Sequence, residues 1–67
     1  MYAFRKQREK AKMTQAEVAK AADVWVTVIS KIENGQRRLL ASEVKKYAHI
    51  LGCAPEDLLE EEPASVR

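Results

Sequence analysis

The amino-acid sequence predicts an all-α fold made of five short helices. Apolar residues recur at helical spacing in several segments, and typical start and stop residues bound those segments. Only one run of the chain resembles a strand, and an isolated strand would leave its backbone N–H and C=O groups unpaired. With 67 residues, the chain has room for one domain with one hydrophobic core.

The first two helices are predicted at residues 2–11 and 15–22. The first segment is rich in Ala, Lys, Arg, Gln and Glu, which favour helices. Before the second, Thr14 and Glu17 have the spacing of a capping box, in which each side chain accepts a hydrogen bond from the other residue's backbone N–H. We expect this second helix to bury Val18 against the core.

Residues 23–35 carry conflicting signals. Their first half is β-branched and aromatic, which local propensity assigns to a strand. However, Ile29 and Ile32 share one helical face, and Gly35 suits the left-handed residue that ends a helix. Because no partner strand is available, we predict a helix over 26–33, at a local cost of some tenths of a kcal/mol per β-branched residue.

The fourth helix is predicted from apolar residues that recur along one face, namely Ala41, Val44, Tyr47, Ala48 and Leu51. Gly52 marks its end. A short fifth helix is expected to begin at Pro55, because proline suits the first turn of a helix. The acidic segment 60–67 has little to bury, so we expect a disordered tail after a domain of residues 1–59.

Charge is distributed unevenly along the chain. Residues 1–55 contain 11 Lys or Arg against 5 Asp or Glu, a net charge of +6. Residues 56–67 contain 1 Arg against 5 acids, a net charge of −4. A basic body is typical of proteins with a polyanionic partner, although it is also compatible with a surface that only keeps the domain soluble.

Several functional classes receive no support from the sequence. Cys53 is the single cysteine, which rules out an internal disulfide and suits a reducing compartment. No Cys/His cluster has zinc-site spacing, no apolar run approaches the roughly 20 residues of a membrane span, and no signal peptide is visible at the start. His49 and Asp57 flank Cys53 at intervals of four, but Gly52 breaks the helix between them. We therefore expect no enzyme, no metal and no cofactor.

One set of residues is spaced like a known DNA-binding motif: Gln15, Val18, Ala19, Asp23, Val24, Ile29, Ile32, Glu33 and Gly35. Residues 15–34 thereby resemble the helix-turn-helix of the Cro/phage-repressor (XRE) family, and the similarity extends from about Phe4 to Leu59. The resemblance implies a compact five-helix repressor-like DNA-binding domain, with the motif in helices 2 and 3. It also implies a cytoplasmic, DNA-associated protein of a prokaryote or phage.

Four residues depart from the family pattern. Asp23 replaces the usual turn glycine, and a left-handed turn tolerates Asp at some strain. Trp25 replaces the usual Ser or Thr cap and cannot cap with its side chain. Leu39-Leu40 replaces the usual Pro-Ser, and Gln7 replaces an aliphatic residue. Trp25 and Leu39-Leu40 make the surface unusually apolar.

The resemblance implies that the N-terminal end of the third helix enters the major groove of DNA. With Ile29 and Ile32 facing inward, the expected base contacts are Val26, Thr27, Ser30 and Lys31. The expected phosphate contacts are Gln15, Trp25, Asn34, Arg37 and Arg38. The alternative for Val26 is incidental exposure.

Three other side chains carry specific expectations. Besides a DNA backbone contact, two other roles are open for Trp25, namely packing over the helix junction and anchoring a partner protein. The resemblance implies a partly buried ion pair between Arg8 and Glu33, the alternative being two solvated charges of little energetic effect.

The expected function is a sequence-specific regulator of transcription, a repressor that binds an inverted repeat as a homodimer. Its interface would use apolar residues left over from the core, namely Leu39, Leu40, Ile50 and one of Leu58 or Leu59, with Ile50 exposed in the monomer. The alternative is that these residues complete a monomer core. The alternative function is a protein-interaction module, an antitoxin or antirepressor, with Trp25, Leu39 and Leu40 as anchors. No small-molecule ligand is expected, because no effector-binding domain follows.

Overall fold

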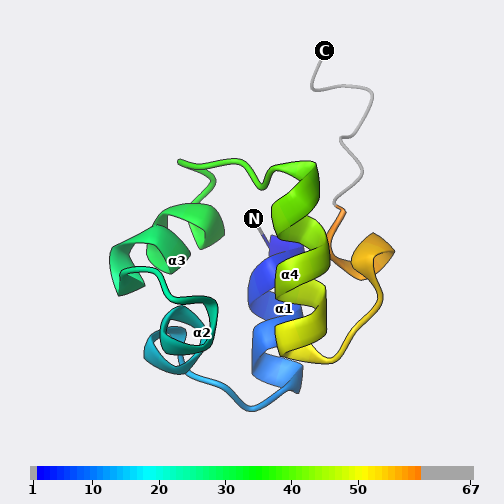
Figure 1. The fold of residues 1–67 in the computed structure, drawn as a ribbon, viewed down its shortest axis with the longest axis horizontal. Coiled ribbons are helices and arrows are strands. Elements are labelled where there is room, and N and C mark those ends of the chain that lie inside the picture. Colours follow the sequence, from blue (N-terminus) through cyan, green and yellow to red (C-terminus); the bar gives the residue numbers. More distant parts are fainter. Residues whose placement is uncertain (1, 60–67) are drawn as a thin grey trace.

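The computed structural model describes residues 2–59, which form helices joined by short connections (Figure 1). The elements are α1 (Tyr2–Lys10), α2 (Gln15–Ala22), α3 (Val26–Glu33), α4 (Ala41–Leu51) and the 3₁₀ turn η1 (Pro55–Leu58). The all-α fold class is confirmed, and so is the helix over 26–33 despite its strand-like composition. The expected tail at 60–67 lies outside the described residues.

The expectation of five α-helices is corrected in the last element, because residues 2–59 form four α-helices followed by a single 3₁₀ turn. Two i→i+3 hydrogen bonds define this turn, from the Asp57 N–H to the Ala54 carbonyl at 2.9 Å and from the Leu59 N–H to the Glu56 carbonyl at 3.2 Å. A segment of four residues is too short to complete the hydrogen bonds of an α-helix, so the tighter turn is the stable form.

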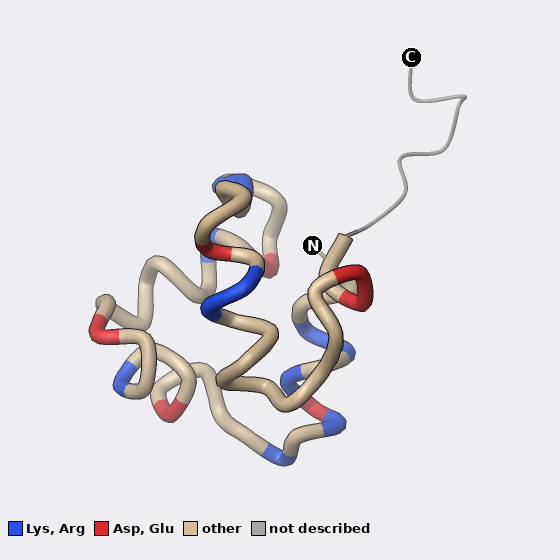
Figure 2. The backbone as a smooth tube through the Cα atoms, turned by 45° about the vertical axis from the view of Figure 1, so that its right-hand side comes forward, with Lys and Arg blue, Asp and Glu red and all other residues tan. Residues whose placement is uncertain are grey.

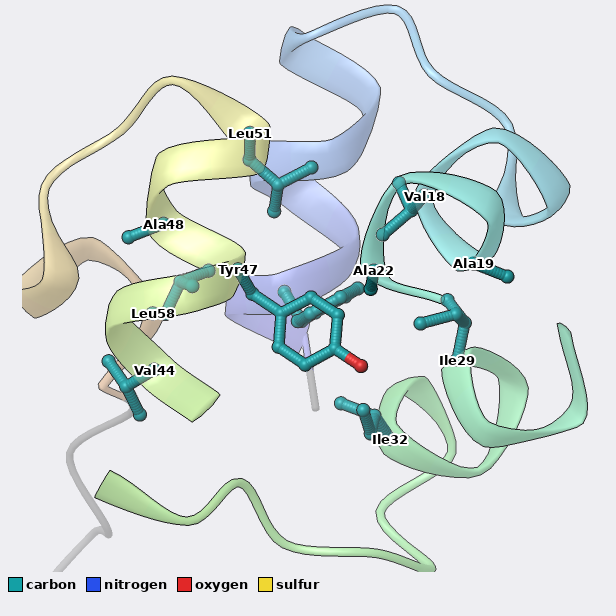
Figure 3. Close-up of a cluster of buried hydrophobic side chains, with 11 residues drawn as sticks. Val18, Ala19, Ala22, Ile29, Ile32, Val44, Tyr47, Ala48, Leu51 and Leu58 are labelled. Carbon is teal, nitrogen blue, oxygen red and sulfur yellow. The ribbon is translucent and has the colours of Figure 1, made fainter. Parts of the chain in front are cut away.

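One hydrophobic core joins all five elements (Figure 3). Its buried members are Phe4, Val18, Ala19, Ala22, Ile29, Ile32, Val44, Tyr47, Ala48, Leu51 and Leu58. Tyr47 projects from α4 into the middle of the cluster, and its ring meets Phe4 of α1 edge to face, with the centroids 5.3 Å apart. Edge-to-face contacts of this kind add to the stabilisation that burial of the two rings provides.

Each of the four α-helices ends in a Schellman motif, in which one residue adopts the left-handed conformation. The left-handed residues are Lys12, Asp23, Gly35 and Gly52. In each case the next residue's N–H bonds back to a carbonyl in the last helical turn, as Gln36 does to Lys31 at 2.8 Å and Val24 does to Ala19 at 3.0 Å. The stops at Gly35 and Gly52 and the left-handed Asp23 are confirmed, whereas Lys12 was not anticipated.

The helices divide into two groups in space (Figure 1). Helices α2 and α3 pack against each other on one side of the molecule, and η1 packs against both α1 and α4 on the other. Helix α3 contacts α2 and α1 through its inner face. Its outer face is therefore left open to a partner. Within residues 2–59, no helix combines the length and apolar content required to cross a membrane.

Candidate nucleic-acid interface

Helix α3 has an inner face that packs on the core and an outer face that is open to solvent. Ile29 and Ile32 are fully buried, which orients the helix on the core. On the outer face, Thr27 and Lys31 are exposed and Ser30 is half-buried. The exposed Val26 is the first residue of the same helix. All four expected base-contact residues therefore lie within residues 26–31 of α3.

Trp25 stands immediately before α3 and is the most exposed large apolar residue of the described chain, at 81%. Its backbone is extended (φ −74°, ψ 149°), and its side chain makes no capping hydrogen bond, as its chemistry requires. The interpretation that Trp25 packs over the helix junction is wrong, because so exposed an indole is in contact with little protein. A contact with DNA or with a partner protein remains as its predicted role.

An ion pair fastens α3 to the rest of the domain. The Arg8 guanidinium of α1 donates to both carboxylate oxygens of Glu33, from Nε to Oε2 and from Nη2 to Oε1. Arg8 Nη1 also donates to the Met13 carbonyl at 2.8 Å. The two charged side chains are only 13% and 5% exposed, so the pair is partly buried. Its hydrogen bonds to Glu33 raise the pKa of Arg8 further.

The same carboxylate holds the start of α2. Gln15 Nε2 donates to Glu33 Oε1 at 2.9 Å. One amide hydrogen of Gln15 is therefore used inside the protein, which leaves the other for the expected phosphate contact. Glu33, the last residue of α3, thus links Gln15 at the start of α2 and Arg8 in α1 in a single polar network.

Another ion pair, which sequence reasoning missed, joins the loop between α3 and α4 to the first turn of α4. Arg37 donates through Nη1 and Nη2 to the two carboxylate oxygens of Glu43, at 3.1 and 2.9 Å. Glu43 Oε1 also accepts from the Leu40 N–H at 2.9 Å, at the first turn of α4. Hydrogen bonding to Arg37, followed by the Leu40 N–H, lowers the pKa of Glu43. The spacing of Leu40 and Glu43 matches half of a capping box, a signal available in the sequence.

The two adjacent arginines of this loop thus differ. The Arg37 charge is neutralised by Glu43, whereas Arg38 is exposed and forms no ion pair within residues 2–59. Basic positions also occur along α1 and in α4 (Figure 2). On the outer face of α3, Lys31 is the only basic residue, and the one acid of that helix, Glu33, is enclosed. Asn34, at the end of α3, is exposed, and its amide lies 3.5 Å from the Ser30 hydroxyl.

The expected dimer residues fall into three environments. Leu40 and Leu59 are exposed, at 62% and 59%. Leu39 and Ile50 are half-buried against the core, so the expectation that Ile50 is exposed in the monomer is wrong. Leu58 is fully buried, because η1 turns it toward α4, and it is unavailable to a partner.

Metal binding finds no geometric support in the described part of the chain, where no three His, Cys, Asp or Glu side chains are placed to hold an ion. His49 is exposed, and Cys53 is half-buried beside the core.

Comparison with known proteins agrees with this arrangement of helices. A helix-turn-helix family model matches residues 4–58, which include α2, α3, α4 and all but the start of α1. No curated protein and no solved structure matches the chain. The family match covers most of the sequence, and it includes the α2–α3 pair whose outer face is open. The chain therefore belongs to the XRE-type helix-turn-helix family and is a DNA-binding regulator of that type.

Proposed function

We propose that this protein is a repressor that binds a specific double-stranded DNA sequence through α3, as a homodimer on an inverted repeat. The observation that supports this proposal is the division of α3 into two faces. Ile29 and Ile32 anchor one face in the core, while the other presents hydrogen-bonding side chains to solvent. Because an α-helix fits the major groove, that outer face is able to meet base edges.

Each proposed base contact has a distinct chemistry. The Lys31 ammonium donates to the O6 and N7 acceptors of guanine. The hydroxyls of Thr27 and Ser30 donate or accept, so they suit several bases. The Val26 side chain, 43% exposed, packs on a thymine methyl group. Together these residues distinguish a short sequence of base pairs.

The proposed phosphate contacts differ in strength. Arg38 has no ion-pair partner within residues 2–59, so it is expected to contribute most to affinity. Arg37 shares its guanidinium with Glu43 and contributes less. Gln15, Trp25 and Asn34 donate neutral hydrogen bonds, which position the domain on the backbone.

Fluorescence-anisotropy titration of labelled DNA at several salt concentrations tests the proposal. Arg38→Ala should weaken binding to every sequence and reduce the slope of log affinity against log salt by about one unit. Arg37→Ala should have a smaller effect, because its charge is already paired. Lys31→Ala should instead relax discrimination at one or two base pairs, by about 1–3 kcal/mol.

Two outcomes would count against this assignment. If Lys31→Ala weakens all sequences equally, Lys31 contacts phosphate and the recognition face of α3 is rotated from the one proposed. If the wild-type protein binds no DNA at low salt, the second candidate function applies, a protein-interaction module. The exposure of Trp25 and Leu40 favours that second function, and Leu39 is a weaker anchor because it is half-buried.

A further inference from the structure

The turn between α2 and α3 places an acidic and an aromatic side chain around an open hollow. Asp23, Val24 and Trp25 line this hollow. Both Asp23 and the Trp25 indole are exposed. Within residues 2–59 no ion pair engages Asp23 and no cation lies over Trp25, since the cation–π contact there is between Lys46 and Tyr47. The carboxylate and the ring are therefore available to a ligand.

The electrostatics of this turn favour a cation. The turn lies between the C-terminal end of α2 and the N-terminal end of α3, whose dipole ends are opposite in sign, and Lys20 lies in the last turn of α2. The attraction for a cation at the hollow therefore comes from the negative charge of Asp23 itself. Asp23 is held in the left-handed conformation (φ 60°, ψ 46°) by its own N–H and that of Val24, which bond back to the last turn of α2. The position of the acid is thus set by the backbone.

We propose that the hollow binds an arginine side chain presented by a partner protein. A guanidinium is planar, so it stacks on the exposed indole of Trp25 while its N–H groups donate to the Asp23 carboxylate. Val24 provides the apolar wall for the alkyl part of the arginine. The occupant is accordingly a basic segment of another protein.

Occupancy of the hollow would regulate DNA binding, a consequence that rests on the proposed function. Trp25 directly precedes Val26, the first proposed base contact, so a segment bound there takes space that DNA needs. Asp23 makes the competition unequal, because its carboxylate attracts the arginine, whereas the Trp25 indole offers the DNA backbone only a neutral hydrogen bond. A basic partner would therefore act as an antirepressor.

The single tryptophan of the chain makes the hollow directly observable, because all indole emission comes from Trp25. The full chain, without DNA and at low salt, is titrated with a capped peptide of alternating glycine and arginine. The matched peptide carries glutamine in place of arginine. We expect the arginine peptide to change the Trp25 emission and the glutamine peptide to leave it unchanged.

Variants distinguish the hollow from general attraction between opposite charges. Asp23→Asn tolerates the left-handed turn and should weaken peptide binding by about fivefold, the loss of one exposed ion pair. Asp23→Gly, which suits that turn even better, should give the same loss. Glu56→Gln removes an equal charge from η1 and should leave binding unchanged. No emission change at millimolar peptide, or equal losses in the Asp23 and Glu56 variants, would overturn the proposal.

A competition with labelled DNA separates this inference from the proposed function. The arginine peptide should displace DNA from the wild-type protein at a lower concentration than from Asp23→Asn. If the peptide binds but the protein binds no DNA, the hollow stands and the DNA-binding proposal fails. If DNA binds and the peptide does not, only the hollow fails.

Discussion

Two neighbouring leucines show how strongly environment differs between single residues. Leu58 is fully buried and lies beside Val44 and Ala48 of α4 (Figure 3). Leu59, the next residue, is exposed and its backbone is extended (φ −91°, ψ 106°). Both have the same side chain, so burial alone should determine what each contributes to stability.

Truncating these leucines should therefore have unequal effects on stability. Leu58→Ala should lower the free energy of unfolding by about 3 kcal/mol, because it removes buried methyl groups and leaves a cavity. Leu59→Ala, measured at a protein concentration low enough to keep the chain monomeric, should change it by less than about 0.5 kcal/mol. Urea unfolding followed by circular dichroism measures both variants, and equal losses would show that η1 is oriented differently.

At the scale of elements, α1 and α3 depend on one partly buried ion pair. Arg8→Ala would leave the Glu33 carboxylate enclosed with only part of its hydrogen bonding, and should lower the free energy of unfolding by about 3 kcal/mol. Replacing both partners with apolar residues, Arg8→Met and Glu33→Leu together, should recover most of that loss. Urea unfolding checks the pair, and a double variant less stable than Arg8→Ala alone would contradict this account.

The connection between α3 and α4 should respond to acid. Arg37 holds the pKa of Glu43 below its ordinary value, so in acid the unfolded chain takes up a proton before the folded domain does. The contribution of Glu43 is therefore complete above the ordinary glutamate pKa of about 4.3, and it is lost as pH falls through the lowered folded value. Stability should decline correspondingly in that window.

Substitution of Glu43 isolates this acid-sensitive contribution. Glu43→Gln should flatten the decline of unfolding free energy between about pH 5 and pH 3, measured by urea unfolding at each pH. Glu56→Gln, which removes a carboxylate without an ion pair in residues 2–59, is the control for loss of one acid. An unchanged profile in Glu43→Gln would mean that the pair with Arg37 does not persist in solution.

At the scale of the whole molecule, the exposed leucines support the proposed dimer. Leu40 precedes α4 and Leu59 follows η1, and these two elements pack together, with α4 also against α2 and η1 on the side away from the α2–α3 pair (Figure 1). An interface there would leave both recognition helices free. Two copies would then meet half-sites separated by about one helical turn of DNA, about 34–36 Å.

Leu40→Glu and Leu59→Glu should dissociate this dimer and leave the fold intact, because both positions are exposed. Static light scattering at tens of micromolar protein measures the mass, and circular dichroism checks the fold. Ile50→Glu is a poor test, since it would place a charge against the core. A wild-type mass of one chain in the absence of DNA, together with a complex of only one chain per inverted-repeat duplex, would refute the dimer.

The sequence by itself determined where most helices begin and end. Thr14 and Glu17 form the expected capping box, at 3.1 and 2.8 Å, and Gly35 and Gly52 adopt the left-handed conformation that ends α3 and α4. Such signals are local, because each involves residues within about one helical turn of each other. The helical spacing of Ile29 and Ile32 outweighed β-propensity, because a helix places both side chains on one inner face, where both are buried.

Tertiary structure alone decided which chemically equivalent groups are free. Arg37 and Arg38 are adjacent and alike in the sequence, yet only Arg37 meets the carboxylate of Glu43. In the same way, only Leu58 of the final leucine pair enters the core. Ion pairing and burial depend on which element packs beside a residue. The sequence immediately around that residue does not specify which distant segment this will be.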